Sequence, residues 1–160
     1  MHHARATASM VGMNIPELTR RVENLLRLGT VAEVDHPAAR CRVKTGGLLT
    51  DWLPWFTRRA GSTNDWDPPS VGEQCLVLSP SGDPAVGFVL VGVYSQANPA
   101  DSDDPAVHRT EWANGDHRQH HADSGEYRLH VSGHVQIDAA SLTIDCSGPV
   151  VINGSTIDLN

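Results

Sequence analysis

Residues 126–160 read EYRLHVSGHVQIDAASLTIDCSGPVVINGSTIDLN, and apolar residues recur along this stretch in short alternations. The alternations begin at Tyr127, Val135, Leu142, Val150 and Ile157, which lie 8, 7, 8 and 7 residues apart. Two inward residues separated by one outward residue are typical of a strand. Repetition at a fixed short interval predicts a β-solenoid for these residues, which we call the repeat segment.

The repeat segment cannot be stable as a single strand-turn coil, because short strands bury one face and a narrow coil leaves its edges unpaired. Three intertwined chains would supply roughly 33 inward side chains, each contributing about 1.5–3 kcal/mol when buried. The sequence therefore favours an obligate trimeric β-helix, with an antiparallel meander or a monomeric right-handed β-helix as alternatives. The predicted inward residues are Tyr127, Leu129, Val131, Val135, Ile137, Leu142, Ile144, Val150, Ile152, Ile157 and Leu159.

Charge is distributed unevenly along the 160 residues. Residues 1–97 carry nine basic and nine acidic side chains, so the net charge of −7 arises entirely after residue 97. An acidic rod is a poor ligand for phosphate backbones or anionic lipid, which argues against nucleic acid as a partner of this part. No run of 18 apolar residues occurs, so no transmembrane helix is predicted.

Residues 1–13 contain no apolar signal core and are interpreted as a tag or a disordered N-terminus. Residues 14–28 are predicted to form a helix, with Asn14 as cap, Glu17 completing a capping box and Gly29 ending it. Its apolar stripe either packs on its own domain or docks a neighbouring protein. The stripe consists of Ile15, Leu18, Val22, Leu25 and Leu26.

Residues 29–97 are predicted to form a small closed barrel of the OB type, because short strands alternate with glycine-containing bends and no interior helix is indicated. The last two strands are apolar on both faces, so one face needs a cover and self-association is the expected one. The three cysteines lie in apolar alternations and are expected to be buried free thiols of a protein made in the bacterial cytoplasm. The five predicted strands are 30–35, 40–45, 48–53, 74–79 and 87–94.

Residues 98–106 are predicted to be a linker, since prolines and three aspartates extend the chain. Residues 107–160 are predicted to form the spike. The expected architecture is thus all-β: an N-terminal helix, a five-stranded OB-fold barrel and an intertwined trimeric β-helix needle.

Several short motifs of the barrel region follow one another over about 70 residues. They are residues 29–35 (GTVAEVD), 42–44 (RVK), 50–55 (TDWLPW), 59–61 (RAG), 69–74 (PSVGEQ), 78–80 (LSP), 82–83 (GD) and 87–94 (GFVLVGVY). In these motifs the chain resembles the baseplate assembly protein V family, the central spike of contractile phage tails and phage-tail-like bacteriocins, which is related to type VI secretion spikes. The motif residues are Gly29, Val43, Trp52, Pro54, Trp55, Gly61, Gly72, Glu73, Gly82 and Asp83.

The resemblance implies a homotrimer whose OB domains associate and whose needle has no active site. Such a spike sits at the centre of the baseplate in the virion or bacteriocin particle and contacts hub and tail-tube proteins. It plugs the tail tube and is driven into the target's outer membrane when the sheath contracts. Stiffness is the physical demand, and interchain strand pairing supplies it.

The sequence departs from the family at its tip. Members with a sharpened tip end in a His-x-His element that holds iron, but no His-x-His occurs here. Either the sequence ends before the tip or a separate capping protein covers the end, so no cofactor or tip metal is assigned. A histidine group is interpreted as solvent-facing or axially stacked rather than as a zinc site. The group comprises His117, His120, His121, His130 and His134, with His120 and His121 as candidate axial ligands.

Two other function classes remain open. An OB-type nucleic-acid or polysaccharide binder needs exposed aromatics, yet Trp52, Trp55 and Phe56 lie in the family motif and residues 1–97 have no net charge. A β-helical polysaccharide enzyme needs paired carboxylates in a cleft, which a narrow rod lacks. The sequence contains neither a nucleophile elbow nor a glycine-rich phosphate loop, so no catalytic residue and no enzyme activity are assigned.

Overall fold

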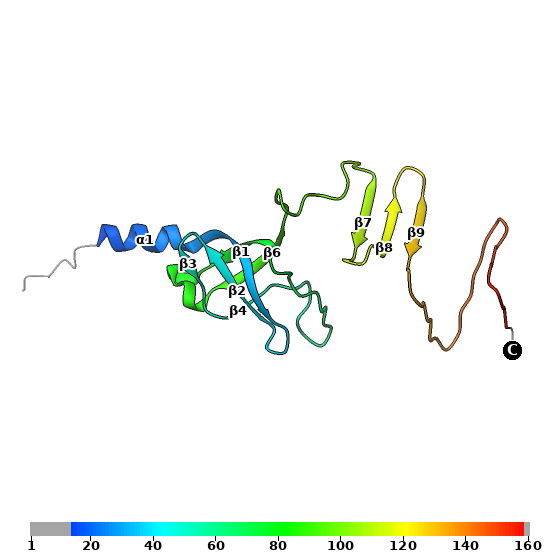
Figure 1. Ribbon diagram of the computed structural model, residues 1–160, viewed down its shortest axis with the longest axis horizontal. Coiled ribbons are helices and arrows are strands. Elements are labelled where there is room, and N and C mark those ends of the chain that lie inside the picture. Colours follow the sequence, from blue (N-terminus) through cyan, green and yellow to red (C-terminus); the bar gives the residue numbers. More distant parts are fainter. Residues whose placement is uncertain (1–13, 159–160) are drawn as a thin grey trace, which may run out of the picture. The chain divides into compact units, whose positions relative to one another are not determined.

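The computed structural model describes residues 14–158, so the segment expected to be a tag or disordered, 1–13, lies outside the described residues. The described residues are mostly β with one α-helix, and they divide into two units whose boundary in the sequence lies between Asp101 and Ser102 (Figure 1). Among the described residues, no helix has the length and apolar character needed to span a bilayer.

The helix α1 (Ile15–Leu25) starts as its sequence predicts. The Asn14 side chain accepts a hydrogen bond from the Glu17 backbone N–H at 3.3 Å, which satisfies one of the unpaired donors of the first turn. Hydrogen bonds from Arg20 and then Arg21 lower the pKa of Glu17 to about 2. None of the residues of α1 is buried, so its apolar stripe is open to solvent in the single chain.

The first unit is built on one sheet whose strand order is β3-β2-β1-β5-β6, with β4 also pairing with β2. All these pairs are antiparallel. The strands are β1 (Leu26–Asp35), β2 (Arg40–Thr45), β3 (Leu48–Leu49), β4 (Leu53–Pro54), β5 (Gln74–Leu78) and β6 (Phe88–Val93).

The sheet closes on itself just after β4. Trp55 forms a parallel bridge with Val89 of β6, and the Phe56 backbone N–H donates to the Val89 carbonyl at 2.9 Å. The ring therefore runs β1-β2-β4-β6-β5 and back to β1, which is an OB-like barrel. Its interior is small and filled by Val31, Cys41, Val43, Leu53, Cys75, Val77 and Val89.

The helix is shorter than the predicted 14–28, and Gly29 does not end it. Leu26 is already extended and pairs with Leu78, while the Leu25 carbonyl accepts from the Ser79 N–H at 2.9 Å. Pairing with a strand 50 residues away therefore overrides the helical pattern of the sequence. Gly29 instead lies inside β1, where an added Cβ would be 2.9 Å from the Lys44 carbonyl oxygen.

The third predicted strand, 48–53, is divided into β3 and β4. The Thr50 hydroxyl accepts from the Val43 backbone N–H at 2.9 Å and donates to the Asp51 carbonyl at 2.8 Å. This buried side chain takes the place of a ladder bond, so the strand bends there. The other predicted strands agree with β2, β5 and β6 to within about a residue at each end.

The second unit begins with a three-stranded antiparallel sheet of β7 (Val107–Glu111), β8 (His117–His121) and β9 (Glu126–His130). The sequence predicted the spike from residue 107, and this part forms a meander instead of a solenoid coil. The predicted linker, 98–106, is attached at both ends. Asn98 Nδ2 donates to the Gly72 carbonyl at 3.3 Å, and Asp104 lies 3.3 Å from His121 Nε2.

Over residues 131–158 the described chain forms no strand, and the inward residues predicted there are mostly exposed. Cys146 is also exposed, whereas Cys41 and Cys75 are buried as expected. Leu159 lies outside the described residues. In a single copy these alternating residues stay exposed, because an isolated extended segment has no neighbouring strand with which to pair.

Replacing Gly82 by alanine is expected to destabilise the barrel by about 2 kcal/mol or more. Gly82 has φ +72°, and an added Cβ would lie 2.5 Å from Arg21 Cα, so α1 would have to move. Chemical denaturation measures the change. Gly61→Ala is the matched control, because an added Cβ there meets nothing within 4 Å. Equal stability of G82A and G61A would contradict the tight contact between α1 and the Pro80–Gly82 turn.

The buried thiols are expected to make the barrel alkali-sensitive. Burial raises the pKa of Cys41 to about 11 and that of Cys75 to about 12, from an ordinary value of about 8.5. As the pH rises, the thiols of the unfolded chain therefore lose their protons before those of the folded chain. The free energy of unfolding is unaffected by the thiols below about pH 8.5 and declines as the pH rises towards 11 and 12.

Urea unfolding between pH 8 and 11 tests this, because the decline should be shallower in the double variant Cys41→Ala/Cys75→Ala. Cys146→Ala, which removes an exposed thiol, should follow the unmodified protein. Parallel curves for the double variant and the unmodified protein would rule out the thiols as the cause.

Candidate functional site

The strands β1, β5 and β6 present a second apolar layer on the side away from the barrel interior. Directly paired residues point to the same face, and the register pairs Leu26 with Leu78 and Leu28 with Leu76. Across β5 and β6 it pairs Leu76 with Leu90 and Leu78 with Phe88. We call this layer the outer apolar face: Leu26, Leu28, Leu76, Leu78, Phe88 and Leu90.

The outer apolar face is uncovered in the single chain. Leu26 and Leu28 are 60% and 63% exposed, and Phe88 and Leu90 are each 43% exposed. Phe56 extends the face, since its ring lies 6.0 Å from that of Phe88. By the register, the face continues into Thr30, Gln74 and Val93, and the charged outward residue of β1, Glu33, lies beyond the bulge of that strand, where it pairs with Arg42.

This arrangement is suited to association and not to chemistry. A contiguous apolar surface on three adjacent strands marks a protein contact, because monomeric soluble proteins rarely leave such a patch uncovered. Paired aromatics are the residues that contribute most at the centre of interfaces. The sequence predicted that strands apolar on both faces need a cover, and the outer apolar face is the surface that needs it.

The motif residues of the barrel mostly have structural roles. Trp55 packs against the core, and its ring centroid lies 5.7 Å from that of Trp66. The Arg42 guanidinium lies over Trp52, with Cζ 5.8 Å from the ring centroid. Gly72 adopts φ +93° in the turn before β5, and Asp83 accepts from the Ala85 N–H at 3.0 Å. Of the remaining motif residues, Val43 lies in the core, Pro54 lies in β4 and Gly61 lies in an open loop.

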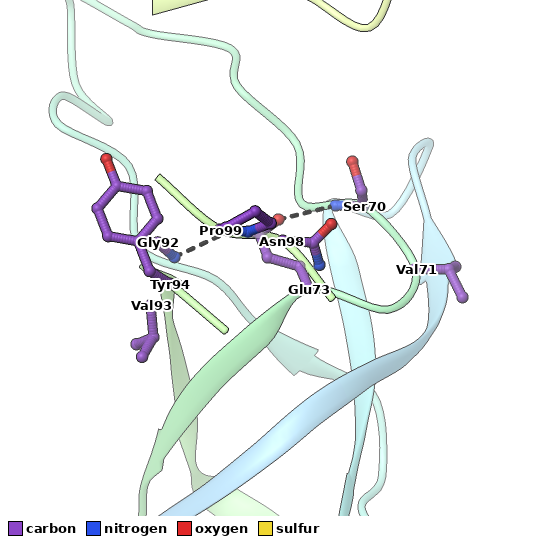
Figure 2. A pocket seen from close by; sticks show the side chains of 8 residues that line it. All are labelled: Ser70, Val71, Glu73, Gly92, Val93, Tyr94, Asn98 and Pro99. Carbon is purple, nitrogen blue, oxygen red and sulfur yellow. Dashed lines mark hydrogen bonds between the residues drawn. The ribbon is translucent and has the colours of Figure 1, made fainter. Parts of the chain in front are cut away.

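Glu73 joins two loops at one end of the barrel. Its carboxylate accepts from the Ser70 N–H and from the Gly92 N–H, both at 3.0 Å, as the dashed lines in Figure 2 show. A surface hollow of about 360 Å³ lies here, lined in part by Val71, Tyr94 and Pro99. Because both carboxylate oxygens are already engaged by the backbone, Glu73 serves as a brace for these loops and not as a ligand group.

The two candidate axial histidines lie on opposite faces of the second sheet, since they are consecutive residues of β8. His121 pairs with Asp104, and His120 stands opposite His108 and Tyr127. The structure instead brings together His117 and His130, which are 13 residues apart in the sequence.

Sequence reasoning missed Leu26 and Leu28 as members of the outer apolar face. Leu26 continues the helical stripe and Leu28 lies within the predicted helix 14–28, so both were interpreted as the end of a helix. Alternation of Leu26, Leu28 and Thr30 with Arg27 and Gly29 was the available sign that a strand had begun.

Residues 27–94 match the family described as "Type VI secretion system/phage-baseplate injector OB domain". The chain is also 52% identical over 89 residues to the Spike protein of Escherichia phage P2. The aligned stretch covers 56% of this chain and 42% of that protein, so the chain matches less than half of the relative's length.

The matched residues begin in β1 and end just after β6, and they therefore contain all of the barrel strands and the outer apolar face except Leu26. The resemblance seen in the sequence motifs is confirmed. Through residues 27–94, the chain thus contains a barrel that matches the phage-baseplate injector OB domain, and it is similar over 89 residues to a phage spike protein.

Proposed function

We propose that this protein is the structural central spike of a contractile phage tail or of a phage-tail-like bacteriocin. It acts as a homotrimer in the baseplate, plugs the end of the tail tube and is driven into the target outer membrane on sheath contraction. The observation that carries the proposal is the uncovered outer apolar face, in a chain that is 52% identical over 89 residues to a spike protein.

Three copies of the outer apolar face cover one another in this proposal. Leu28, Leu90 and Phe88 expose about half of their surface or more in the single chain, and removing such surface from water gains about 25 cal/mol per Å². The face contains no charge whose desolvation would oppose association. A symmetric assembly uses the same patch of every copy, as a closed ring requires.

The repeat segment completes the trimer as an intertwined β-helix. Its apolar residues alternate with the period of a strand, yet residues 131–158 have no strand partner within one chain. Winding three copies about one axis gives each short strand a neighbour and places residues such as Ile137, Leu142 and Ile144 inside.

The proposed mechanism is mechanical. A rod joined by interchain hydrogen bonds along its length resists bending, because bending would break many bonds together. The role needs no catalytic residue, so we propose that the protein is not an enzyme. Its proposed partners are the baseplate hub, tail-tube proteins and a separate tip-capping protein, within a particle assembled in the bacterial cytoplasm.

An OB-type nucleic-acid or polysaccharide binder is the alternative function. It would shift a single-stranded oligonucleotide in a gel at low salt, where electrostatic binding is strongest. The spike is expected to leave the oligonucleotide unbound.

The first test is the mass of the particle in solution. Light scattering coupled to size exclusion should give three times the 17.3 kDa of one chain. The double variant Phe88→Asp/Leu90→Asp places two carboxylates at the centre of the outer apolar face and should weaken association by several kcal/mol, since each buried unpaired charge opposes assembly. Val71→Asp is the matched control, because Val71 is 67% exposed and lies in a turn outside the face.

A compact single-copy mass for the unmodified protein would refute the proposal. Equal loss of assembly in V71D and in the double variant would show that the face is not the contact. Far-UV circular dichroism of each variant separates lost association from lost folding.

The second test uses Cys146 as a reporter of the intertwined repeat. Cys146 shares the inward alternation of Leu142 and Ile144, yet it is exposed in a single chain. In the trimer no thiol should react quickly with a disulfide reagent, because Cys41 and Cys75 are buried and Cys146 is enclosed. Ile144→Asp should open the needle and release one fast thiol per chain.

Thr143→Asp is the control for this test, since residue 143 points outward and its charge meets solvent. One fast thiol per chain in the unmodified trimer would show that residues 142–146 do not form the interior of a needle.

A further inference from the structure

The second sheet brings two imidazole rings together on one face. His117 of β8 is the direct cross-strand partner of His130 of β9. Their ring centroids are 5.2 Å apart and the ring planes differ by 22°, so the rings stack. Imidazole nitrogens bind a divalent transition cation at about 2.0–2.1 Å, so a shared ion requires one nitrogen of each ring to face it.

A hydrogen bond fixes the tautomer of one ring. His117 Nδ1 lies 3.1 Å from the Gly115 carbonyl oxygen, which can only accept, so Nδ1 carries the proton and Nε2 keeps its lone pair. Metal-binding histidines in proteins generally donate their second ring N–H to a carbonyl or carboxylate in this way. The bond also fixes the ring of His117, which is half-buried.

Two acidic residues are neighbours of His117, one across the sheet and one in the sequence. Glu111 of β7 stands opposite His117 and is paired with Arg109, and Asp116 immediately precedes His117. The Asp116 carboxylate accepts hydrogen bonds from the Ser132 N–H and from Asn114 Nδ2, each at 2.8 Å. A carboxylate in the residue next to His117 adds negative charge near the pair, which favours a bound cation.

We propose that His117 and His130 chelate a divalent transition cation, with Zn²⁺ as the representative ion, and that the ion joins β8 to β9. Among the described residues no three His, Cys, Asp or Glu side chains are arranged around a metal position. The protein therefore supplies two nitrogens and water completes the coordination, which leaves Cu²⁺ binding more tightly than Zn²⁺.

A second cross-strand histidine pair provides the internal comparison. His108 of β7 stands opposite His120 of β8 on the other face of the same sheet. No stacking of these two rings occurs in the described part of the chain, where the only stacked histidines are His117 and His130. His108 is exposed, so replacing it should leave the sheet intact.

Isothermal titration of the full chain with ZnCl₂ tests the proposal. Every variant carries His2→Gln and His3→Gln, so that the adjacent N-terminal histidines do not bind the ion. The expected result is one Zn²⁺ per chain, with affinity lowered at least about tenfold in His117→Gln and in His130→Gln, as for loss of groups at metal sites. His108→Gln should match the parent, and CuCl₂ should bind more tightly than ZnCl₂.

Thermal unfolding gives a second readout that does not depend on the affinity fit. Zn²⁺ should raise the melting temperature of the parent and of H108Q but not that of H130Q, because an ion bound only by the folded state stabilises it. Equal zinc affinity in all variants would overturn the proposal. So would one ion per three chains, or a loss confined to H108Q, since both results would place the ion elsewhere.

Discussion

The strands β1, β5 and β6 carry apolar side chains on both faces, and both layers have to be removed from water. Their inner residues, among them Cys75, Val77 and Val89, fill a barrel whose interior has room for only seven buried apolar side chains. Their outer residues form a face of similar size that the chain itself does not cover. A core this small leaves the barrel marginal alone, because stability rises with the fraction of surface buried. Folding of the barrel and its association are therefore linked through the same three strands.

The strands of the barrel could be predicted from the sequence because their signals are local. Alternating residues in β2 and β5, and the glycines at their ends, fix the strand positions within about a residue. The helix end could not be predicted, because the pairing of Leu26 with Leu78 depends on a segment distant in the chain. The division of the third strand depends on one hydroxyl, that of Thr50, whose partner lies across the sheet.

The functional surfaces were only partly foreseeable for the same reason. The double apolar character of β5 and β6 is visible in the sequence, but the face they share with Leu26 and Leu28 requires the register. The stacked pair His117 and His130 depends on the turn that ends at Gly125 (φ +69°), which sets the pairing of β8 with β9. The sequence suggested His120 and His121 as candidate axial ligands of a symmetric trimer, and strand alternation directs these two side chains to opposite faces.

The direct passage from α1 into β1 has a mechanical consequence. No loop separates Leu25, the last helical residue, from Leu26, the first residue of the strand at the middle of the sheet (Figure 1). The Ser79 N–H bonds the Leu25 carbonyl, and Gly82 lies against Arg21, so the junction is clamped on two sides. A torque applied to the helix is thus delivered straight into the backbone ladder of the barrel, with no slack segment to absorb it.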